Sequence, residues 1–119
     1  MNNRAIGTDK EIIATKYLID NGAKILETNF HYHRNGEIDI VAMDAGYLVF
    51  AEVKYRKNKA DLTAENAVNY KKMRTICRCS DYYRLMNNLS DDMPVRYDVI
   101  AIYDDEIRWY KNAFEYIGM

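Results

Sequence analysis

The chain has 119 residues, of which 49% are hydrophobic and 29% charged, and it contains one proline. This composition predicts one globular domain over residues 1–119 and excludes a disordered chain. No segment approaches the roughly 18 apolar residues of a membrane span, and the N-terminal stretch lacks the apolar core of a signal peptide. We therefore expect a cytoplasmic protein with no membrane partner.

The net charge of −1 is unevenly distributed along the chain. Residues 1–53 carry five basic and eight acidic side chains, residues 54–84 carry nine and three, and residues 85–119 carry three and seven. A basic block beside carboxylates favours a phosphodiester substrate with its metal ion. A solvated, lysine-rich helix is the alternative interpretation.

The first predicted helix begins with Thr8-Asp9-Lys10-Glu11, which has the pattern of a capping box, and ends near Asp20, before Asn21-Gly22. Glu11 shares a stripe with Ala14 and Leu18. It therefore either faces the sheet or only satisfies a backbone donor at the helix start. The expected apolar side comprises Ile12, Ile13, Tyr17, Leu18 and Ile19.

A predicted strand over residues 23–30 leads into a polar connection that contains His31, His33 and Arg34. We expect a surface loop that contacts phosphate. Zinc is disfavoured because no further His or Cys lies nearby in the sequence.

Two alternating apolar runs, residues 37–43 and 47–55, flank Asp44-Ala45-Gly46 and predict a β-hairpin. With an even-numbered loop, Asp39 lies opposite Glu52 and Glu37 opposite Lys54, whereas a three-residue loop would separate the two carboxylates onto opposite faces. The other face of the hairpin is then apolar and consists of Ile38, Ile40, Ala42, Val49, Ala51 and Val53.

Carboxylates at the edge of an apolar face lose solvation unless they are paired or coordinate a metal. The face with Glu37, Asp39, Glu52 and Lys54 also carries Val41, Met43, Leu48 and Phe50, so it is not a simple water-facing surface. The apolar surroundings therefore shift the interpretation towards a functional site such as a metal site, and a solvated sheet face with ordinary ion pairs is the alternative.

The second half of the chain begins with a basic loop, and Thr63 or Asp61 is expected to cap a helix from about Ala64 to Asn87. Its stripe of Val68, Ile76, Cys79, Tyr83 and Met86 includes Lys72, which either extends out to solvent or points at the site. Cys77 and Cys79 are two residues apart, on different helix faces, and are expected to be reduced thiols.

Strands are predicted over residues 95–103 and 107–110. The resulting order is helix, three strands, helix, two strands. This order predicts an α/β (α+β) fold of three layers, with a mixed sheet between two helices.

Asp39 and Glu52-Val53-Lys54 together resemble the D…(D/E)-x-K signature of the restriction-endonuclease-like PD-(D/E)XK nucleases. The longer strings GEIDIVA and LVFAEVKYR, with Arg96-Tyr97-Asp98-Val99, resemble the YraN-like family of small bacterial proteins regarded as endonucleases. That resemblance covers nearly the whole chain and implies a restriction-endonuclease-like fold.

The resemblance implies that Asp39 and Glu52 hold Mg²⁺ or Mn²⁺, helped by the Val53 carbonyl and water molecules. Lys54 would orient the nucleophile or neutralise charge on the phosphate. Glu11 would reach the metal directly or through water, and Glu37 would support Lys54.

The expected function is a metal-dependent endonuclease, with DNA favoured over RNA and branched or damaged DNA as substrate. Nucleic-acid contacts are expected from Arg34, Arg56, Lys57 and Lys72. The alternative is a non-catalytic nucleic-acid-binding module of a repair, recombination or uptake complex. A homodimer, which would help so small a domain to grip a junction, is left open.

Overall fold

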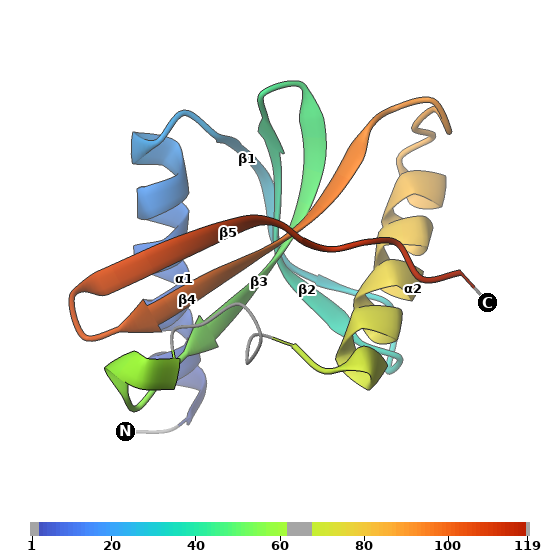
Figure 1. Cartoon of the computed structure of the whole chain (residues 1–119). Helices are drawn as coiled ribbons and strands as arrows, with labels where there is room; N and C mark the ends of the chain where they lie inside the picture. The colour runs from blue at the N-terminus through green and yellow to red at the C-terminus, as the bar shows by residue number, and fades with distance from the viewer. Residues whose placement is uncertain (1–2, 62–67, 119) are drawn as a thin grey trace.

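A computed structural model describes residues 3–61 and 68–118, with the side chains of the first helix described from residue 9 onward. Two helices, α1 (Asn3–Asp20) and α2 (Tyr70–Met86), lie on opposite sides of one sheet (Figure 1). The sheet contains β1 (Lys24–His31), β2 (Glu37–Asp44), β3 (Tyr47–Tyr55), β4 (Val95–Tyr103) and β5 (Glu106–Phe114), and a short 3₁₀ turn, η1 (Lys59–Asp61), follows β3. This arrangement confirms the predicted order of elements and the α+β class.

The strands lie in the order β1-β2-β3-β4-β5. The β3–β4 pair is parallel and the other three pairs are antiparallel, so the sheet is mixed, as predicted. The hairpin register is also confirmed between the turn and the middle of the strands, because Val41 pairs with Phe50 and Met43 with Leu48. The turn has φ of 51° at Ala45 and 85° at Gly46, the positive values that a two-residue type I′ turn requires.

The hairpin departs from the predicted register at its far end. The β2–β3 ladder stops at the Ile40–Ala51 pair. Beyond it, the Asp39 carboxylate accepts a hydrogen bond from the Val53 amide (2.8 Å), so a side chain takes a place that a backbone carbonyl would hold. Ile38 consequently joins the core on the α2 side and not the face of Ile40 that the alternation predicted.

The sheet separates two hydrophobic cores. The core under α2 is centred on Phe50, Ile76 and Tyr83, and the core under α1 on Leu18, Ile40 and Ile100. Both cysteines of α2 are free and buried, and both contribute to the core under this helix.

Helix α1 begins at Asn3, so Thr8 lies inside it and the predicted capping box is wrong. Its end near Asp20 is confirmed, and Gly22 follows with a φ of +99°. The predicted apolar side is also partly wrong, since Ile12, Ile13 and Ile19 are exposed. Among the helix side chains that the structure describes, from residue 9 onward, Ala14 and Leu18 are the buried ones in the core under α1.

Helix α2 begins at Tyr70, later than predicted, and its N-cap is Asn69, whose side chain accepts from the Lys72 amide at 2.9 Å. Asp61 lies in η1 and caps no part of α2. The other cap candidate, Thr63, and the predicted first turn from Ala64 lie outside the described residues. The predicted stripe is confirmed at Ile76, Cys79 and Tyr83, whereas Met86 is exposed.

Strand β5 is longer than the predicted 107–110 because its far half is tied to β4. Trp109 Nε1 and the Asn112 amide both donate to the Asp98 carboxylate at 2.8 Å.

None of the helices in residues 3–61 and 68–118 combines the length and the apolar character needed to cross a bilayer.

Candidate functional site

Two carboxylates meet at the end of the hairpin that lies away from its turn. Glu52 on β3 is 6% exposed and Asp39 on β2 is partly buried. Burial raises the pKa of both groups, and the neighbouring Asp39 charge adds to the effect on Glu52, whose pKa rises to about 7. Two desolvated acids side by side therefore form a place where a positive charge is stabilised.

Two lysines from different elements approach the same oxygen. The Nζ of Lys54, on β3, lies 3.6 Å from Glu52 Oε1, and the Nζ of Lys72, in the first turn of α2, lies 3.8 Å from it. Of the two orientations considered for Lys72, the structure therefore shows the one that faces the acidic pair. Both lysines lower the pKa of Glu52 and partly offset its burial.

Glu11 approaches the acidic pair from α1. Burial raises its pKa, a hydrogen bond from Asn29 lowers it, and the charges of Asp39 and Glu37 raise it further. Of the two predicted roles, the inward-facing one agrees with the structure. A role at the helix start does not, because α1 begins at Asn3.

Glu37 lies beside His31 of β1, and its predicted role as a support for Lys54 in the metal-bound site remains a prediction. Its carboxylate lies 3.6 Å from His31 Nε2, whereas the ammonium of Lys54 pairs with Glu52. The β1–β2 ladder continues to the His31–Glu37 pair after the β2–β3 ladder has ended, which turns Glu37 towards β1. The predicted position of Glu37 directly opposite Lys54 is therefore wrong.

The other predicted nucleic-acid residues lie around this end of the sheet. Arg34, in the connection between β1 and β2, and Lys57, after β3, are exposed. Arg56 is half-buried, and its amide donates to the Ile102 carbonyl at 2.7 Å. Their contacts with nucleic acid remain a prediction.

Sequence reasoning missed two neighbours of the site. Asn29 bonds Glu11, and the Lys10 ammonium lies 4.1 Å from the ring centroid of Tyr55. Both contacts join α1 to a strand that is distant in sequence. No local pattern could have revealed them.

Among the described residues, no group of three or more His, Cys, Asp or Glu side chains is arranged to hold a metal ion. Asp39 and Glu52 thus remain a pair, and Glu11 is not a third ligand in this arrangement. Mg²⁺ commonly binds through one or two carboxylates and retains several waters or phosphate oxygens. The pair therefore fits a hard divalent cation with a water-rich coordination shell.

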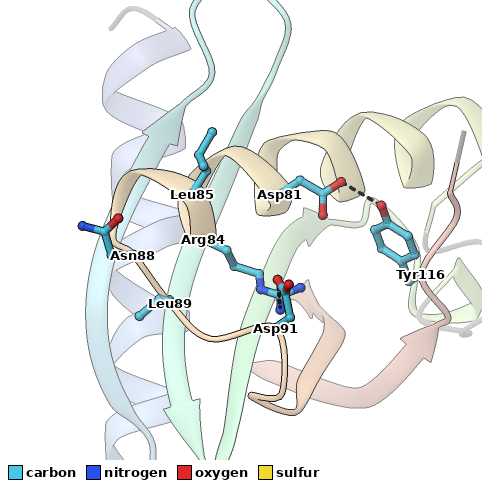
Figure 2. A pocket seen from close by; sticks show the side chains of 7 residues that line it. All are labelled: Asp81, Arg84, Leu85, Asn88, Leu89, Asp91 and Tyr116. Carbon is cyan, nitrogen blue, oxygen red and sulfur yellow. Dashed lines mark hydrogen bonds and ion pairs between the residues drawn. The ribbon is translucent and has the colours of Figure 1, made fainter.

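The acidic pair does not line the hollow shown in Figure 2, which lies along the C-terminal half of α2. There the Tyr116 hydroxyl donates to the Asp81 carboxylate at 2.7 Å. The Arg84 and Asp91 side chains, 3.8 Å apart, line another part of the hollow.

Fold and site together define a small α+β protein with one buried and one partly buried carboxylate and two lysines at one end of a mixed sheet. The chain belongs to the family described as "Uncharacterised protein family UPF0102", whose model matches residues 10–102. This is the YraN-like family predicted from the sequence.

The similarity to relatives extends over nearly the whole chain. A UPF0102 protein of Lachnoclostridium phytofermentans is 45% identical, over 99% of both chains. A UPF0102 protein of Acetivibrio thermocellus is 41% identical, over 95% of this chain and 93% of its own. A third, from Clostridioides difficile, is 40% identical, over 96% of this chain and 100% of its own.

Proposed function

We propose that this protein is a metal-dependent endonuclease that hydrolyses phosphodiester bonds in DNA, on a restriction-endonuclease-like PD-(D/E)XK scaffold. Branched or damaged DNA is the proposed substrate. One observation carries the proposal: the desolvated Asp39–Glu52 pair, with the Lys54 and Lys72 ammonium groups 3.6 and 3.8 Å from Glu52 Oε1. A site that only stabilised the fold would gain nothing from two desolvated acids side by side.

Asp39 and Glu52 would hold Mg²⁺ or Mn²⁺, with the Val53 carbonyl and waters as further ligands. The Val53 amide already fixes Asp39 through its 2.8 Å hydrogen bond, so one residue would both position a carboxylate ligand and supply a carbonyl ligand. When bound, such an ion polarises the phosphate and lowers the pKa of a bound water.

Lys54 and Lys72 would act on the phosphate from two sides. Lys54 would orient the attacking water or offset negative charge that develops on the phosphate oxygens. Lys72 would hold the incoming phosphate, since its long side chain can turn from Glu52 to a neighbouring anion. Glu11, with its raised pKa, would hold a water molecule at the α1 side of the site.

A second candidate function is a nucleic-acid-binding module without catalysis. One observation favours it: the described residues supply two closely placed carboxylates and no third His, Cys, Asp or Glu ligand. Lys54 and Lys72 would then serve as permanent counter-charges to Glu52. The two candidates differ in whether a divalent ion binds to the pair.

Mn²⁺ titration by calorimetry tests the proposal without a choice of substrate. We expect the wild type to bind Mn²⁺ and Asp39→Ala and Glu52→Ala each to lose it. Lys16→Ala, which removes an exposed partner of Asp20, is the matched control and should bind as the wild type does. If the wild type binds no Mn²⁺ even with DNA present, the endonuclease proposal fails and the binding module replaces it.

Cleavage of a labelled four-way DNA junction and of a linear duplex with Mg²⁺ then tests activity. Removal of one group that stabilises transition-state charge typically costs about a hundredfold to a thousandfold in rate. We therefore expect Lys54→Ala to lose that much while it still binds Mn²⁺. Mn²⁺ binding without cleavage of any DNA substrate would contradict an enzyme that acts unaided.

A further inference from the structure

Three basic side chains follow one outward stripe of α2, at positions 71, 74 and 78. Lys71 and Arg78 are exposed and Arg74 is half-buried, whereas Ile76 and Tyr83 face the core. Spacings of three and four residues bring side chains together on a helix surface. We call Lys71, Arg74 and Arg78 the basic stripe; Asp81, the one acidic residue of α2, lies beyond its end and bonds Tyr116.

The connection between β1 and β2 is fixed against the same helix. Gly36 lies so close to α2 that a Cβ at this position would overlap the Thr75 side chain and lie 3.2 Å from Cys79 Sγ. Backbone hydrogen bonds from Tyr32 to Gly36 (2.9 Å) and from Asn35 to Tyr32 (2.8 Å) close the connection. It is therefore a rigid neighbour of α2.

Two rings of the β1–β2 connection and one ring of α2 lie together next to the basic stripe. The Tyr32 and Tyr82 rings stack with centroids 4.3 Å apart, and the His33 ring lies 5.4 Å from that of Tyr82. Tyr82 is one helical turn beyond Arg78, and its exposure, like that of Tyr32, is intermediate. We call Tyr32, His33 and Tyr82 the aromatic end; the same connection carries the exposed Arg34.

The opposite end of the stripe lies in the same helical turn as Lys72, which contacts the acidic pair. Lys71 is adjacent in sequence to Lys72, whose Nζ lies 3.8 Å from Glu52 Oε1. At 1.5 Å of rise per residue, Lys71 and Arg78 are about 10 Å apart along the axis and Lys71 and Tyr82 about 16 Å. The stripe thus places three cationic side chains along about 10 Å of the helix surface, where they can contact the phosphates of one strand.

We propose that the basic stripe and the aromatic end form a track for single-stranded nucleic acid that leads to Asp39 and Glu52. This inference rests on the proposed function and names its substrate class, a single-stranded segment next to the point of cleavage. Phosphates lie along Lys71, Arg74 and Arg78, and an unpaired base stacks on the outer face of the Tyr32–Tyr82 pair. Duplex DNA cannot use the rings, because its base faces are already covered by neighbouring base pairs.

The test measures binding of a fluorescein-labelled 12-nucleotide single-stranded DNA and of a blunt duplex of equal length, by anisotropy in EDTA. EDTA removes divalent ions, so the result is independent of the metal site and of cleavage. Lys71→Gln/Arg74→Gln removes two charges from the stripe. Lys16→Gln/Lys24→Gln removes two exposed charges from α1 and β1 as the matched control.

We expect the stripe variant to bind the single strand more weakly than the wild type does. The negative slope of log K against log salt concentration should become shallower by about 1.4, at about 0.7 per lost phosphate contact. The control should retain the wild-type slope. Equal slopes for both variants, or no binding of the single strand by the wild type, would overturn the track.

The aromatic end is tested separately. Tyr82→Leu should weaken single-strand binding by between about fivefold and a hundredfold, because stacking on one ring contributes that much per base. Tyr82→Phe, which keeps the ring, should bind as the wild type does, and Tyr82→Leu should leave duplex binding unchanged. Tyr32→Leu repeats the test if Tyr82→Leu does not fold.

Equal losses for single strand and duplex in both leucine variants would overturn the single-strand preference. The result of this binding test can be distinguished from the result of the Mn²⁺ titration that tests the proposed function. Mn²⁺ binding that depends on Asp39 and Glu52, together with an unaltered salt slope in the stripe variant, would leave the endonuclease proposal standing and remove the track.

Discussion

The Asp39 carboxylate accepts a hydrogen bond from the Val53 amide at 2.8 Å, just beyond the point where the β2–β3 ladder stops at Ile40–Ala51. One contact therefore ends the regular pairing of the hairpin and places Asp39 beside Glu52, the residue that precedes Val53. This hydrogen bond thus contributes both to the stability of the fold and to the position of Asp39 in the candidate site. Different substitutions at Asp39 can test these two roles separately.

Asp39→Asn keeps an oxygen that can accept from the Val53 amide, whereas Asp39→Ala leaves this donor without its partner. An unsatisfied buried donor costs about 1–3 kcal/mol. We expect Asp39→Ala to lose this much in free energy of unfolding, Asp39→Asn to lose clearly less, and both to lose Mn²⁺ binding. Urea unfolding in EDTA and calorimetry measure the two effects, and equal destabilisation would contradict the structural role of the bond.

Glu52→Gln should change how stability depends on pH. The pKa of Glu52 is raised from 4.5 to about 7, so the folded state holds the proton more tightly than the unfolded chain. The stabilisation that this gives is fully present below about pH 4.5 and is lost as pH rises through about 7. Glutamine does not titrate in this range. The free energy of unfolding of Glu52→Gln minus that of the wild type should therefore increase as pH rises from about 4.5 to above 7.

The expected gain is on the order of 3 kcal/mol between low pH and pH 8, at about 1.4 kcal/mol per unit of pKa. It is measured by urea unfolding at pH 5 and pH 8 in EDTA, with Lys16→Gln as a surface control. Parallel pH profiles for wild type and Glu52→Gln would show that Glu52 titrates normally. Because protons compete with the metal for these carboxylates, Mn²⁺ should bind more tightly at pH 8 than at pH 6.

Asp98→Ala should destabilise the fold strongly. The fully buried Asp98 carboxylate pairs with the Arg96 guanidinium at 2.7 Å and accepts from Trp109 Nε1 and the Asn112 amide, both on β5. Removal of one partner from a buried ion pair costs about 3–5 kcal/mol. Asp44, which also pairs with Arg96 at 2.8 Å, should recover only part of this loss.

Guanidinium unfolding followed by Trp109 fluorescence measures the effect. The control is Glu106→Ala, which removes a partner of Arg108 at the surface and should cost much less than Asp98→Ala. A loss in Asp98→Ala as small as that of the control would show that Arg96 and Asp44 hold β5 in place without Asp98.

Gly36→Ala tests how closely the β1–β2 connection approaches α2. Gly36 has a φ of +151°, and an added Cβ would overlap the Thr75 side chain. Gly22→Ala is the control, because φ is +99° there and nothing lies within 4 Å of an added Cβ. Overpacking should make Gly36→Ala about 1–3 kcal/mol less stable than Gly22→Ala.

A second substitution, Thr75→Ser, removes the methyl group that the new Cβ would meet and should recover part of the loss. Thermal unfolding of the two single variants and of the double variant measures this. No recovery in the double variant would mean that backbone strain at Gly36, and not contact with α2, causes the loss.

The sequence by itself determined the hairpin and the order of the elements. Alternation over β2 and β3 and the Ala45-Gly46 turn act between residues close in the chain, so the register near the turn could be read directly. The same register brought Asp39 and Glu52 to one end of the hairpin. The long strings around them were sufficient to predict the family to which the chain belongs.

Tertiary structure decided which parts of each helix are buried and which partner each charge takes. Ile12 and Ile19 are as apolar as Leu18, yet only Leu18 faces the sheet, because the position of α1 on the sheet selects one stripe. Glu37 pairs with His31 because the β1–β2 ladder extends further than the β2–β3 ladder. Neither fact is encoded in local periodicity.

Tertiary structure also brought Lys72 to Glu52 and joined Asp98 to Trp109 and Asn112. Lys72 is 20 residues from Glu52 in the sequence and reaches it only because α2 packs on the face of the sheet that contains Phe50. Charge pairs at such separations depend on how elements pack, since the Coulomb energy falls with distance in space and not along the chain. Local sequence patterns therefore determine where the strands form and which side chains they carry. The packing of helices on the sheet determines which charged side chains pair with one another.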